Sequence, residues 1–202
     1  LASGCEHITA VTMAPPGTAE KLSQLTRLGV RAVLLTDPAY AGADTLATAK
    51  TLAAFIKKEK PDFVFCGRQS VDGDTAQVPP CLSVLLGFEI VPSVMKIAGN
   101  TVCLRGGNKS QLTGGQVVTF ERMATLRFPS IRSKCSPIEI IGNDVLRLTA
   151  GECGQNGSPT RVIQSFENVS GRRKCTFILP SELDKVIAES LQKERKTPAA
   201  YS

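Results

Sequence analysis

The stretch RAVLLTDPAYAGADTLATAKTLAAFIKKEKPDFVFCG, residues 31–67, contains one complete strand–helix–strand pattern. Residues 32–36 are apolar enough for a strand buried on both faces, and Asp44 is a good N-cap for a helix whose apolar positions recur every three or four residues. Pro61 separates that helix from a second apolar run, residues 62–66. Two such strands joined by an amphipathic helix are typical of a βαβ unit with parallel strands and a right-handed crossover.

The alternation continues on both sides of this stretch. Residues 8–13 predict an earlier strand, followed by a helix capped by Thr18 and ended by Gly29. On the other side, residues 77–86 predict a third helix, ended by Gly87. These repeated units predict an α/β fold, a doubly wound parallel sheet with helices on both faces.

The pattern changes after the third helix. A fourth strand is expected near residues 89–94, and residues 94–98 and 101–104 flank Gly99-Asn100 as a hairpin. Residues 116–120 form one more apolar run and predict a further buried strand.

Two regions are expected, with a boundary near residue 120. Residues 1–120 form the predicted α/β domain, and a first strand is expected to be missing because residues 1–5 lead straight into the strand at 8–13. Residues 121–202 have few periodic runs before an amphipathic helix at 180–193. Such a segment is more typical of an extended arm that embraces a partner than of a second core.

Composition excludes several classes of protein. The net charge is +6, but the basic residues are spread along the chain and Trp is absent, so nucleic-acid binding is not expected. No apolar stretch is long enough to cross a bilayer. The seven cysteines contain no Cys-x-x-Cys pair, which favours free thiols in a reducing, intracellular compartment. The single histidine, His7, supplies neither a zinc pattern nor a catalytic triad.

The loop after the strand at 62–66 is the candidate binding site, because ligands of open parallel sheets bind beyond the carboxyl ends of the strands. Its glycines and the following helix N-terminus can present N–H groups to phosphate oxygens, and Arg68 can add a charge-assisted contact. Asp72 and Asp74 would repel phosphate unless they bind loop amides or a ribose hydroxyl. Asp74 or Thr75 is expected to start the next helix. A capped turn with a surface arginine explains the same residues equally well.

A second loop, residues 40–45, is small and flexible enough to line the same crevice. Thr45 and Thr48 share one face of the helical turn that follows, either beside a ligand or simply as a cap and its neighbour. Neither Gly-x-Gly-x-x-Gly nor a P-loop pattern occurs, which disfavours a standard dehydrogenase or phosphotransferase.

Two stretches carry a specific resemblance: DPAYAGADTLATA, residues 37–49, and PDFVFCGRQSVDGDTAQV, residues 61–78. Both closely resemble the small (beta) subunit of the electron transfer flavoproteins. The resemblance is strong from residue 8 to about residue 94 and covers most of the chain. It is looser at three later stretches, residues 128–131, 136–139 and 157–160.

The resemblance implies an electron carrier and not an enzyme in its own right. Members of the family pair with a larger alpha subunit that carries an electron-transferring FAD, while the beta subunit holds an adenine nucleotide in its Rossmann-like fold. That nucleotide is AMP in the housekeeping branch and a second FAD, which takes electrons from NADH, in the bifurcating branch. The forms of residues 41–45 and 72–78 are more similar to the bifurcating and nitrogen-fixation-linked members.

The resemblance also implies site residues. Thr45 and Thr48 are expected near the flavin ring, and residues 72–78 around the phosphates and ribose. The full set of expected cofactor-binding residues is Met13, Thr45, Thr48, Cys66, Gly67, Arg68, Gln69, Asp72, Gly73, Asp74, Thr75, Ala76, Gln77 and Val78. Ile131 matches the apolar anchor with which the family docks dehydrogenases such as acyl-CoA dehydrogenases, although an isoleucine buried in its own subunit is the competing explanation.

Departures from the family pattern and rival functions complete the expectations. Pro79-Pro80 stands where the family usually has Gly-Pro, and no counterpart of the family's first strand is present. An ATP-hydrolysing or adenylate-forming enzyme and a nucleotide-sensing module are the alternatives on a similar fold. The expected location is the bacterial cytoplasm, or the mitochondrial matrix if the source is eukaryotic.

Overall fold

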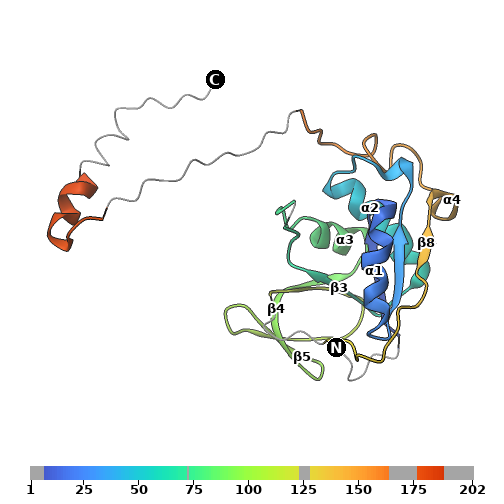
Figure 1. Cartoon of the computed structure of the whole chain (residues 1–202), viewed down its shortest axis with the longest axis horizontal. Coiled ribbons are helices and arrows are strands. Elements are labelled where there is room, and N and C mark those ends of the chain that lie inside the picture. The colour runs from blue at the N-terminus through green and yellow to red at the C-terminus, as the bar shows by residue number, and fades with distance from the viewer. Residues whose placement is uncertain (1–6, 72, 123–127, 164–176, 189–202) are drawn as a thin grey trace. The chain divides into compact units, whose positions relative to one another are not determined.

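The computed structural model describes residues 7–71, 73–122, 128–163 and 177–188 (Figure 1). Contacts divide the chain into two compact units, residues 1–162 and 163–202. The first unit contains all the strands described below, and the second contributes the short helix η3 (Pro180–Glu182) and a helical run at 183–188. The continuation of the helix expected at 180–193 lies outside the described residues.

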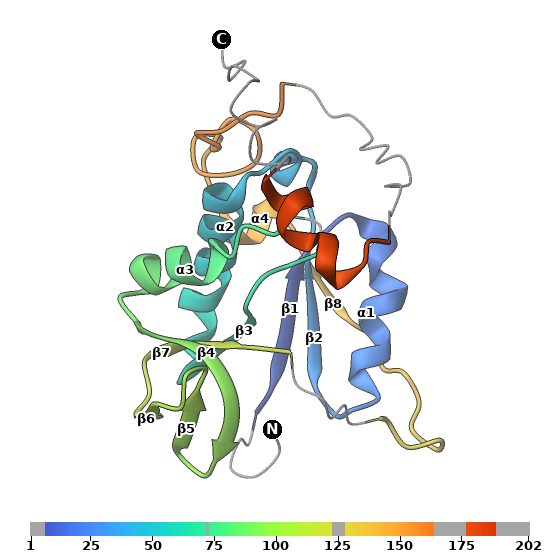
Figure 2. The ribbon, with the colours of Figure 1, turned by 90° about the vertical axis from the view of Figure 1, so that its left-hand side faces the viewer.

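A three-stranded parallel sheet comes from widely separated parts of the chain. Its order is β1 (Thr9–Met13), β2 (Arg31–Leu35) and β8 (Glu139–Ile141). Helices α1 (Ala19–Thr26) and α2 (Thr45–Glu59) lie on opposite sides of this sheet (Figure 2).

Strand β2 is apolar on both faces because a helix packs against each of them. Val33 and Leu35 pack in one core cluster with residues of α2, whereas Ala32 and Leu34 pack with Leu22 of α1. Alternate residues of a strand point to opposite faces, so the run at 32–36 supplies both cores at once.

A five-stranded sheet holds the middle of the chain. Its order is β3 (Phe63–Gly67), β7 (Gln116–Phe120), β4 (Glu89–Ala98), β5 (Thr101–Leu104) and β6 (Lys109–Gln111). The first three strands are parallel and the last three antiparallel. Helix α3 (Val78–Leu86) covers one face, where Leu82 joins the cluster of Val117. The hairpin predicted around Gly99-Asn100 is confirmed by the pairing of β4 with β5.

The short helices η1 (Pro16–Thr18), η2 (Pro38–Tyr40) and α4 (Asn143–Leu146) complete the first unit. Asp44 is the N-cap of α2 as predicted, and Gly87, with φ of 69°, ends α3. Thr18 occupies the N-cap position of α1 but its side chain makes no capping bond. The structure is thus a mixed α/β fold with parallel strands and covering helices. Because the described strands form two sheets, the doubly wound single sheet stays a prediction.

Contacts divide the chain after residue 162, and the domain boundary near residue 120 stays a prediction. Part of the segment after Phe120 returns to the first unit, where β8 pairs with β2. None of the helices in the part of the chain that the structure describes has both the length and the apolar character needed to cross a membrane.

Candidate functional site

The two loops that resemble the flavoprotein subunits meet beyond the sheets. The Thr45 hydroxyl, at the first residue of α2, donates a 2.8 Å hydrogen bond to the side-chain oxygen of Gln77, the N-cap of α3. The bond joins the loop that follows β2 to the loop that follows β3. Both loops lie at the carboxyl ends of their strands, where ligands of parallel sheets bind.

Asp44 fixes the start of α2. One carboxylate oxygen accepts the N–H groups of Leu46 at 3.0 Å and Ala47 at 2.9 Å. The other accepts the N–H group of Thr160 at 3.1 Å and its hydroxyl at 2.8 Å. Burial raises the pKa of the Asp44 carboxyl, but these hydrogen bonds outweigh burial and the pKa lies below its ordinary value.

Residues 154–160, from the part of the chain with few periodic runs, pack against the start of α2. The N–H group of Gln155 donates to the carbonyl of Ala41 at 3.0 Å, and the hydroxyl of Ser158 accepts the N–H of Asp44 at 2.8 Å. A Cβ atom on Gly154 would come within 2.1 Å of the Ala39 carbonyl oxygen, so only glycine permits this approach. Sequence analysis related residues 157–160 to the family but missed that they hold the loop before Thr45.

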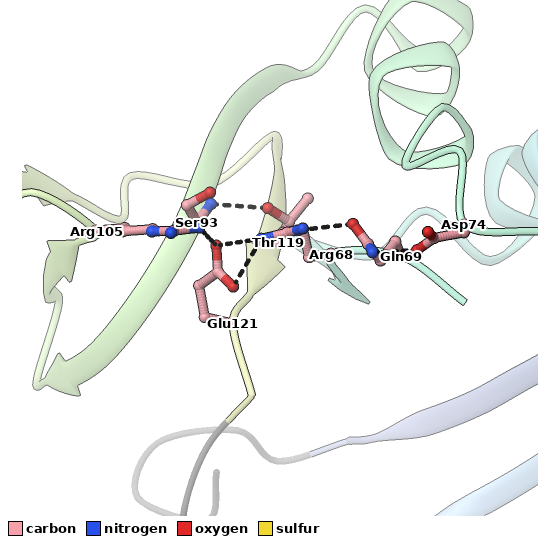
Figure 3. A network of polar contacts seen from close by, with 7 residues as sticks. All are labelled: Arg68, Gln69, Asp74, Ser93, Arg105, Thr119 and Glu121. Atoms are coloured by element: carbon pink, nitrogen blue, oxygen red, sulfur yellow. Dashed lines mark hydrogen bonds and ion pairs between the residues drawn. The ribbon is translucent and has the colours of Figure 1, made fainter. Parts of the chain in front are cut away.

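Arg68 belongs to a chain of polar contacts at the ends of β3 and β7 (Figure 3). Its Nε donates to Gln69 Oε1 at 2.8 Å, and the side-chain amide of Gln69 donates to the Asp74 carboxylate. Its Nη1 lies 3.4 Å from both oxygens of Glu121, which also lies 3.7 Å from Nη1 of Arg105.

Glu121 is the functional candidate that sequence analysis missed. Its side chain is 14% exposed, against 40% for Arg68, and Figure 3 shows it between the two guanidinium groups. A signal for it exists, because a charged residue directly after the buried strand at 116–120 stands at a carboxyl strand end. Two guanidinium groups, of Arg68 and Arg105, and two carboxylates, of Glu121 and Asp74, share this chain of contacts, so their formal charges cancel and an anionic ligand would depend on direct contact with a guanidinium group.

The backbone of the loop at 68–77, and of one residue in β4, takes conformations that L-residues rarely adopt. Asp74 and Ala76 have φ of 47° and 55°, and Ser93 in β4, with φ of 55°, donates its N–H to the Thr119 hydroxyl at 2.8 Å. Positive φ at a residue other than glycine costs about 1–2 kcal/mol and often marks a binding site.

Helix α3 begins within one residue of the expected position 77, but the predicted cap is wrong. Neither Asp74 nor Thr75 caps the helix, because Gln77 is its N-cap and makes no side-chain capping bond. Pro79 and Pro80 have no N–H group, so Val78 is the only residue of the first three that can donate one. The helix N-terminus is therefore a poor phosphate site by itself, and donors must come from the loop at 68–77.

The remaining predicted residues are more scattered. Met13 ends β1, and Thr48 lies in the first turn of α2, where its N–H donates to the carbonyl of Asp44. Burial raises the pKa of the Cys66 thiol, in β3, to about 11, so the thiol stays protonated at neutral pH. Gly67 ends β3, Gly73 is exposed, and Asp72 lies outside the described residues.

Ile131 stands apart from this site. Its side chain is 98% exposed, so the other residues described in the first unit do not bury it. A cavity of about 600 Å³, lined partly by Arg31 and Glu139, also lies away from the loops, at the amino ends of β2 and β8.

Comparison with known proteins gives the same family as the resemblance of residues 37–49 and 61–78. A family model described as the electron transfer flavoprotein domain matches residues 1–125. The chain is 38% identical over 172 residues to the electron transfer flavoprotein subunit beta of Clostridium acetobutylicum, covering 79% of this chain and 66% of the relative. It is 33% identical over 219 residues to Protein FixA of Azorhizobium caulinodans, covering 94% and 76%.

A third relative is the caffeyl-CoA reductase-Etf complex subunit CarD of Acetobacterium woodii, 35% identical over 177 residues and covering 79% of this chain and 66% of the relative. The chain spans about two thirds of the length of the flavoprotein beta subunits it matches. With a family model over more than half of its length, and with relatives of this kind, the chain belongs to the electron transfer flavoprotein family, on the side of its beta subunits.

Proposed function

We propose that this chain binds FAD or AMP at the carboxyl ends of its strands and, with an FAD-bearing alpha subunit, carries electrons between dehydrogenases and an acceptor. The observation that carries the proposal is the contact between Thr45 and Gln77, which joins the two loops that resemble the family, one of which begins with Arg68. Relatives named FixA and CarD favour the bifurcating type, in which this nucleotide is FAD.

The residues present fit the anionic part of an adenine nucleotide. Arg68 and Arg105 provide guanidinium groups, which Glu121 and Asp74 balance in the absence of a ligand, and the loop at 68–77 supplies backbone N–H groups. The Thr45 hydroxyl is held in place by Gln77 and can turn toward a ligand atom. Proline at 79 and 80 removes two helix donors, so Arg68 and the loop amides carry most of the recognition.

This chain's residues would tune a bound flavin without reacting themselves. A flavin supplies the redox chemistry, and hydrogen bonds and charge around it set which redox state is favoured. Thr45 and Thr48 provide the hydroxyls, and Arg68 provides a charge whose field Glu121 partly cancels. No step in this scheme needs a catalytic residue of the chain.

Two surfaces of the chain are assigned to partners. Ile131, which is 98% exposed, serves as the apolar anchor for a dehydrogenase such as an acyl-CoA dehydrogenase. Residues 121–202, the last part of which is the second unit at 163–202, form the arm that contacts the alpha subunit. Since the relatives named above are bacterial, the bacterial cytoplasm is the proposed location.

Nucleotide counting in the complex tests the proposal. The chain is co-expressed with its alpha subunit, the complex is purified, and the nucleotides are released by heat and quantified. Two FAD per complex support the bifurcating type, and one FAD with one AMP supports the structural-nucleotide type. A complex without a nucleotide in this subunit, or one that hydrolyses ATP with magnesium, contradicts the proposal and favours the alternatives.

A paired substitution tests the site. Thr45→Val with Thr48→Val removes both hydroxyls at nearly constant volume and is expected to weaken flavin binding or shift the flavin potential. Ser23→Ala on α1 is a matched control, since its hydroxyl only bonds to the carbonyl of Glu20 on its own helix. Unchanged binding and potential in the double variant exclude these threonines as flavin contacts.

A further inference from the structure

Residues 153–160, the clasp segment, form tight turns beside the start of α2 and belong to the orange loops next to that helix in Figure 2. Within the segment, the N–H group of Gly157 donates to the carbonyl of Cys153 at 3.0 Å, and the Ser158 hydroxyl donates to the carbonyl of Gly154 at 2.7 Å. A Cβ atom on Gly157 would come within 2.5 Å of the Cys153 nitrogen, so only glycine lets this turn close. All four residues are buried, so the clasp segment is packed like a core element.

Both ends of the clasp segment contact the loop before α2. Near its beginning, the N–H group of Gln155 donates to the carbonyl of Ala41 at 3.0 Å, and a Cβ atom on Gly42 would come within 3.2 Å of the Gln155 Cβ. At its end, Thr160 donates its N–H group at 3.1 Å and its hydroxyl at 2.8 Å to one carboxylate oxygen of Asp44. The loop is therefore held from its middle to the N-cap of α2.

Ser158 joins the clasp segment to the backbone of the N-cap. Its hydroxyl accepts the N–H group of Asp44 at 2.8 Å while it donates to the Gly154 carbonyl. A hydroxyl has one donor and two acceptor sites, so one oxygen atom can make both bonds. Ser158 is 9% exposed, and hydrogen bonds that are shielded from water hold their geometry more firmly than exposed ones. Without this hydroxyl, the N–H group of Asp44 would lose the partner that it has in the structure.

The position of Thr45 depends on these contacts, because Thr45 directly follows Asp44 in the chain. The clasp segment holds both the backbone and the side chain of Asp44, and the same carboxylate caps the first turn of α2. The Thr45 hydroxyl, which donates to Gln77, therefore starts from a backbone that is fixed on the side of the clasp segment. Ligand-binding side chains need such support, since a displacement of about 1 Å is enough to weaken a contact.

We propose that Ser158 and Thr160 are positioning residues of the nucleotide site: by holding Asp44, they keep Thr45 in its binding position before a nucleotide arrives. The inference rests on the binding role proposed above for Thr45. A loop that is ordered before binding loses less conformational entropy when the ligand binds, so residues that never touch the nucleotide still strengthen its binding. The effect is expected mainly in the dissociation rate of the nucleotide.

The test measures the Kd of labelled FAD and of labelled AMP for the full chain in complex with its alpha subunit, after the nucleotide of this subunit has been removed and while the alpha subunit keeps its FAD. Thr160→Val removes the hydroxyl at nearly constant volume and is expected to raise the Kd of the nucleotide that binds by about threefold to fivefold. Thr160→Ser, which keeps the hydroxyl, restores most of the affinity. Thr51→Val is the matched control, because the buried Thr51 hydroxyl bonds only to the carbonyl of Ala47 within α2, and it leaves Kd unchanged.

A second readout reports on the loop in the absence of a nucleotide. Hydrogen exchange of the backbone N–H groups of residues 44–47 is expected to be about threefold to fivefold faster in Thr160→Val, well below the melting temperature of the complex. Thr45→Val is expected to raise Kd without changing this exchange rate. In the Thr45→Val background, Thr160→Val should add little to Kd, because the hydroxyl that it positions is gone.

The outcomes separate the inference from the proposed function. If Thr45→Val raises Kd but Thr160→Val does not, the positioning role is refuted and the binding role of Thr45 stands. If Thr160→Val accelerates exchange but both variants keep the wild-type Kd, the binding role of Thr45 is refuted, together with the inference that rests on it. An equal rise of Kd in Thr51→Val assigns the effect to a general weakening of α2 and overturns the positioning role. Binding of neither FAD nor AMP to the wild-type complex refutes the proposed function itself.

Discussion

Replacing Asp44 tests how the candidate site is held together. The carboxylate accepts four hydrogen bonds, two from the first turn of α2 and two from Thr160. Loss of an N-cap side chain costs about 1 kcal/mol. The contacts with Thr160 are exposed and contribute about 1–1.5 kcal/mol together. Asp44→Ala should therefore lower the free energy of unfolding by about 2–2.5 kcal/mol, a fall in Tm of roughly 4–10 °C for a chain of this size.

Asp44→Asn separates the contribution of the helix cap to stability from that of the contacts with Thr160. Asparagine keeps one side-chain oxygen for the N–H groups of Leu46 and Ala47 and is itself a good N-cap. Its NH₂ group faces the donors of Thr160, so only that second contact is lost. The expected cost is about half that of alanine. The free energies are measured by urea unfolding, followed by circular dichroism.

The pH dependence of stability gives an independent check on Asp44. Its pKa is lower in the folded chain than in the unfolded one, so the folded state releases its proton more readily. The stabilisation is therefore complete above the unfolded pKa of about 4 and is lost as the pH falls through the lower, folded pKa. Asp44→Asn should flatten this acid slope. A cost below about 0.5 kcal/mol for Asp44→Ala, or equal costs for the alanine and asparagine variants, would refute the reasoning.

For three further substitutions, the structure predicts whether the free energy of unfolding rises or falls. The buried Tyr40 hydroxyl has no hydrogen-bond partner among the described residues, so Tyr40→Phe should raise the free energy of unfolding by about 1 kcal/mol, and a loss measured by urea unfolding would show that the hydroxyl is satisfied. Ala76 has φ of 55°, so Ala76→Gly should raise stability by about 0.5–1 kcal/mol in the same assay, and destabilisation would contradict the strain. Glu121→Gln should cost about 1 kcal/mol, and a double-mutant cycle with Arg105→Ala should show a shared interaction; strictly additive effects would mean that the two side chains do not couple.

Local patterns predicted the elements of the fold well, because each depends on residues close together in sequence. The strand at 32–36 is apolar on both faces and is buried on both faces. Asp44 caps its helix, and Gly99-Asn100 makes a hairpin. These features need only periodicity and turn chemistry.

Local sequence patterns did not predict which strands far apart in the chain pair with each other. Strand β8 has three residues, too few for a periodic signal, and pairs with β2 more than 100 positions away. Glu121 meets Arg68 only because β7 lies between β3 and β4, an order that no local pattern encodes. Asp74 and Thr75 were good caps by residue type, but the loop places Gln77 at the helix start.

The binding role of the predicted site residues is a separate matter from their placement. The structure brings Thr45 and Gln77 into contact and sets Arg68 beside the same loop. The choice between AMP and FAD depends on groups of a ligand and of a partner subunit, neither of which the sequence of this chain contains. Nucleotide counting in the complex therefore distinguishes AMP from FAD.

Strand direction explains why the two edges of the parallel sheet carry opposite charges. In a parallel sheet with crossover helices, every helix begins at the carboxyl edge and ends at the amino edge. The partial positive charge of helix starts favours carboxylates and anionic ligands, and the partial negative charge of helix ends favours cations. Asp44 accordingly caps the start of α2, whereas Arg27 stands at the end of α1 and binds the carbonyls of Ser130 and Ser133. The same polarity that makes one edge suitable for a nucleotide thus favours, at the other edge, the arginine that holds residues 130–133.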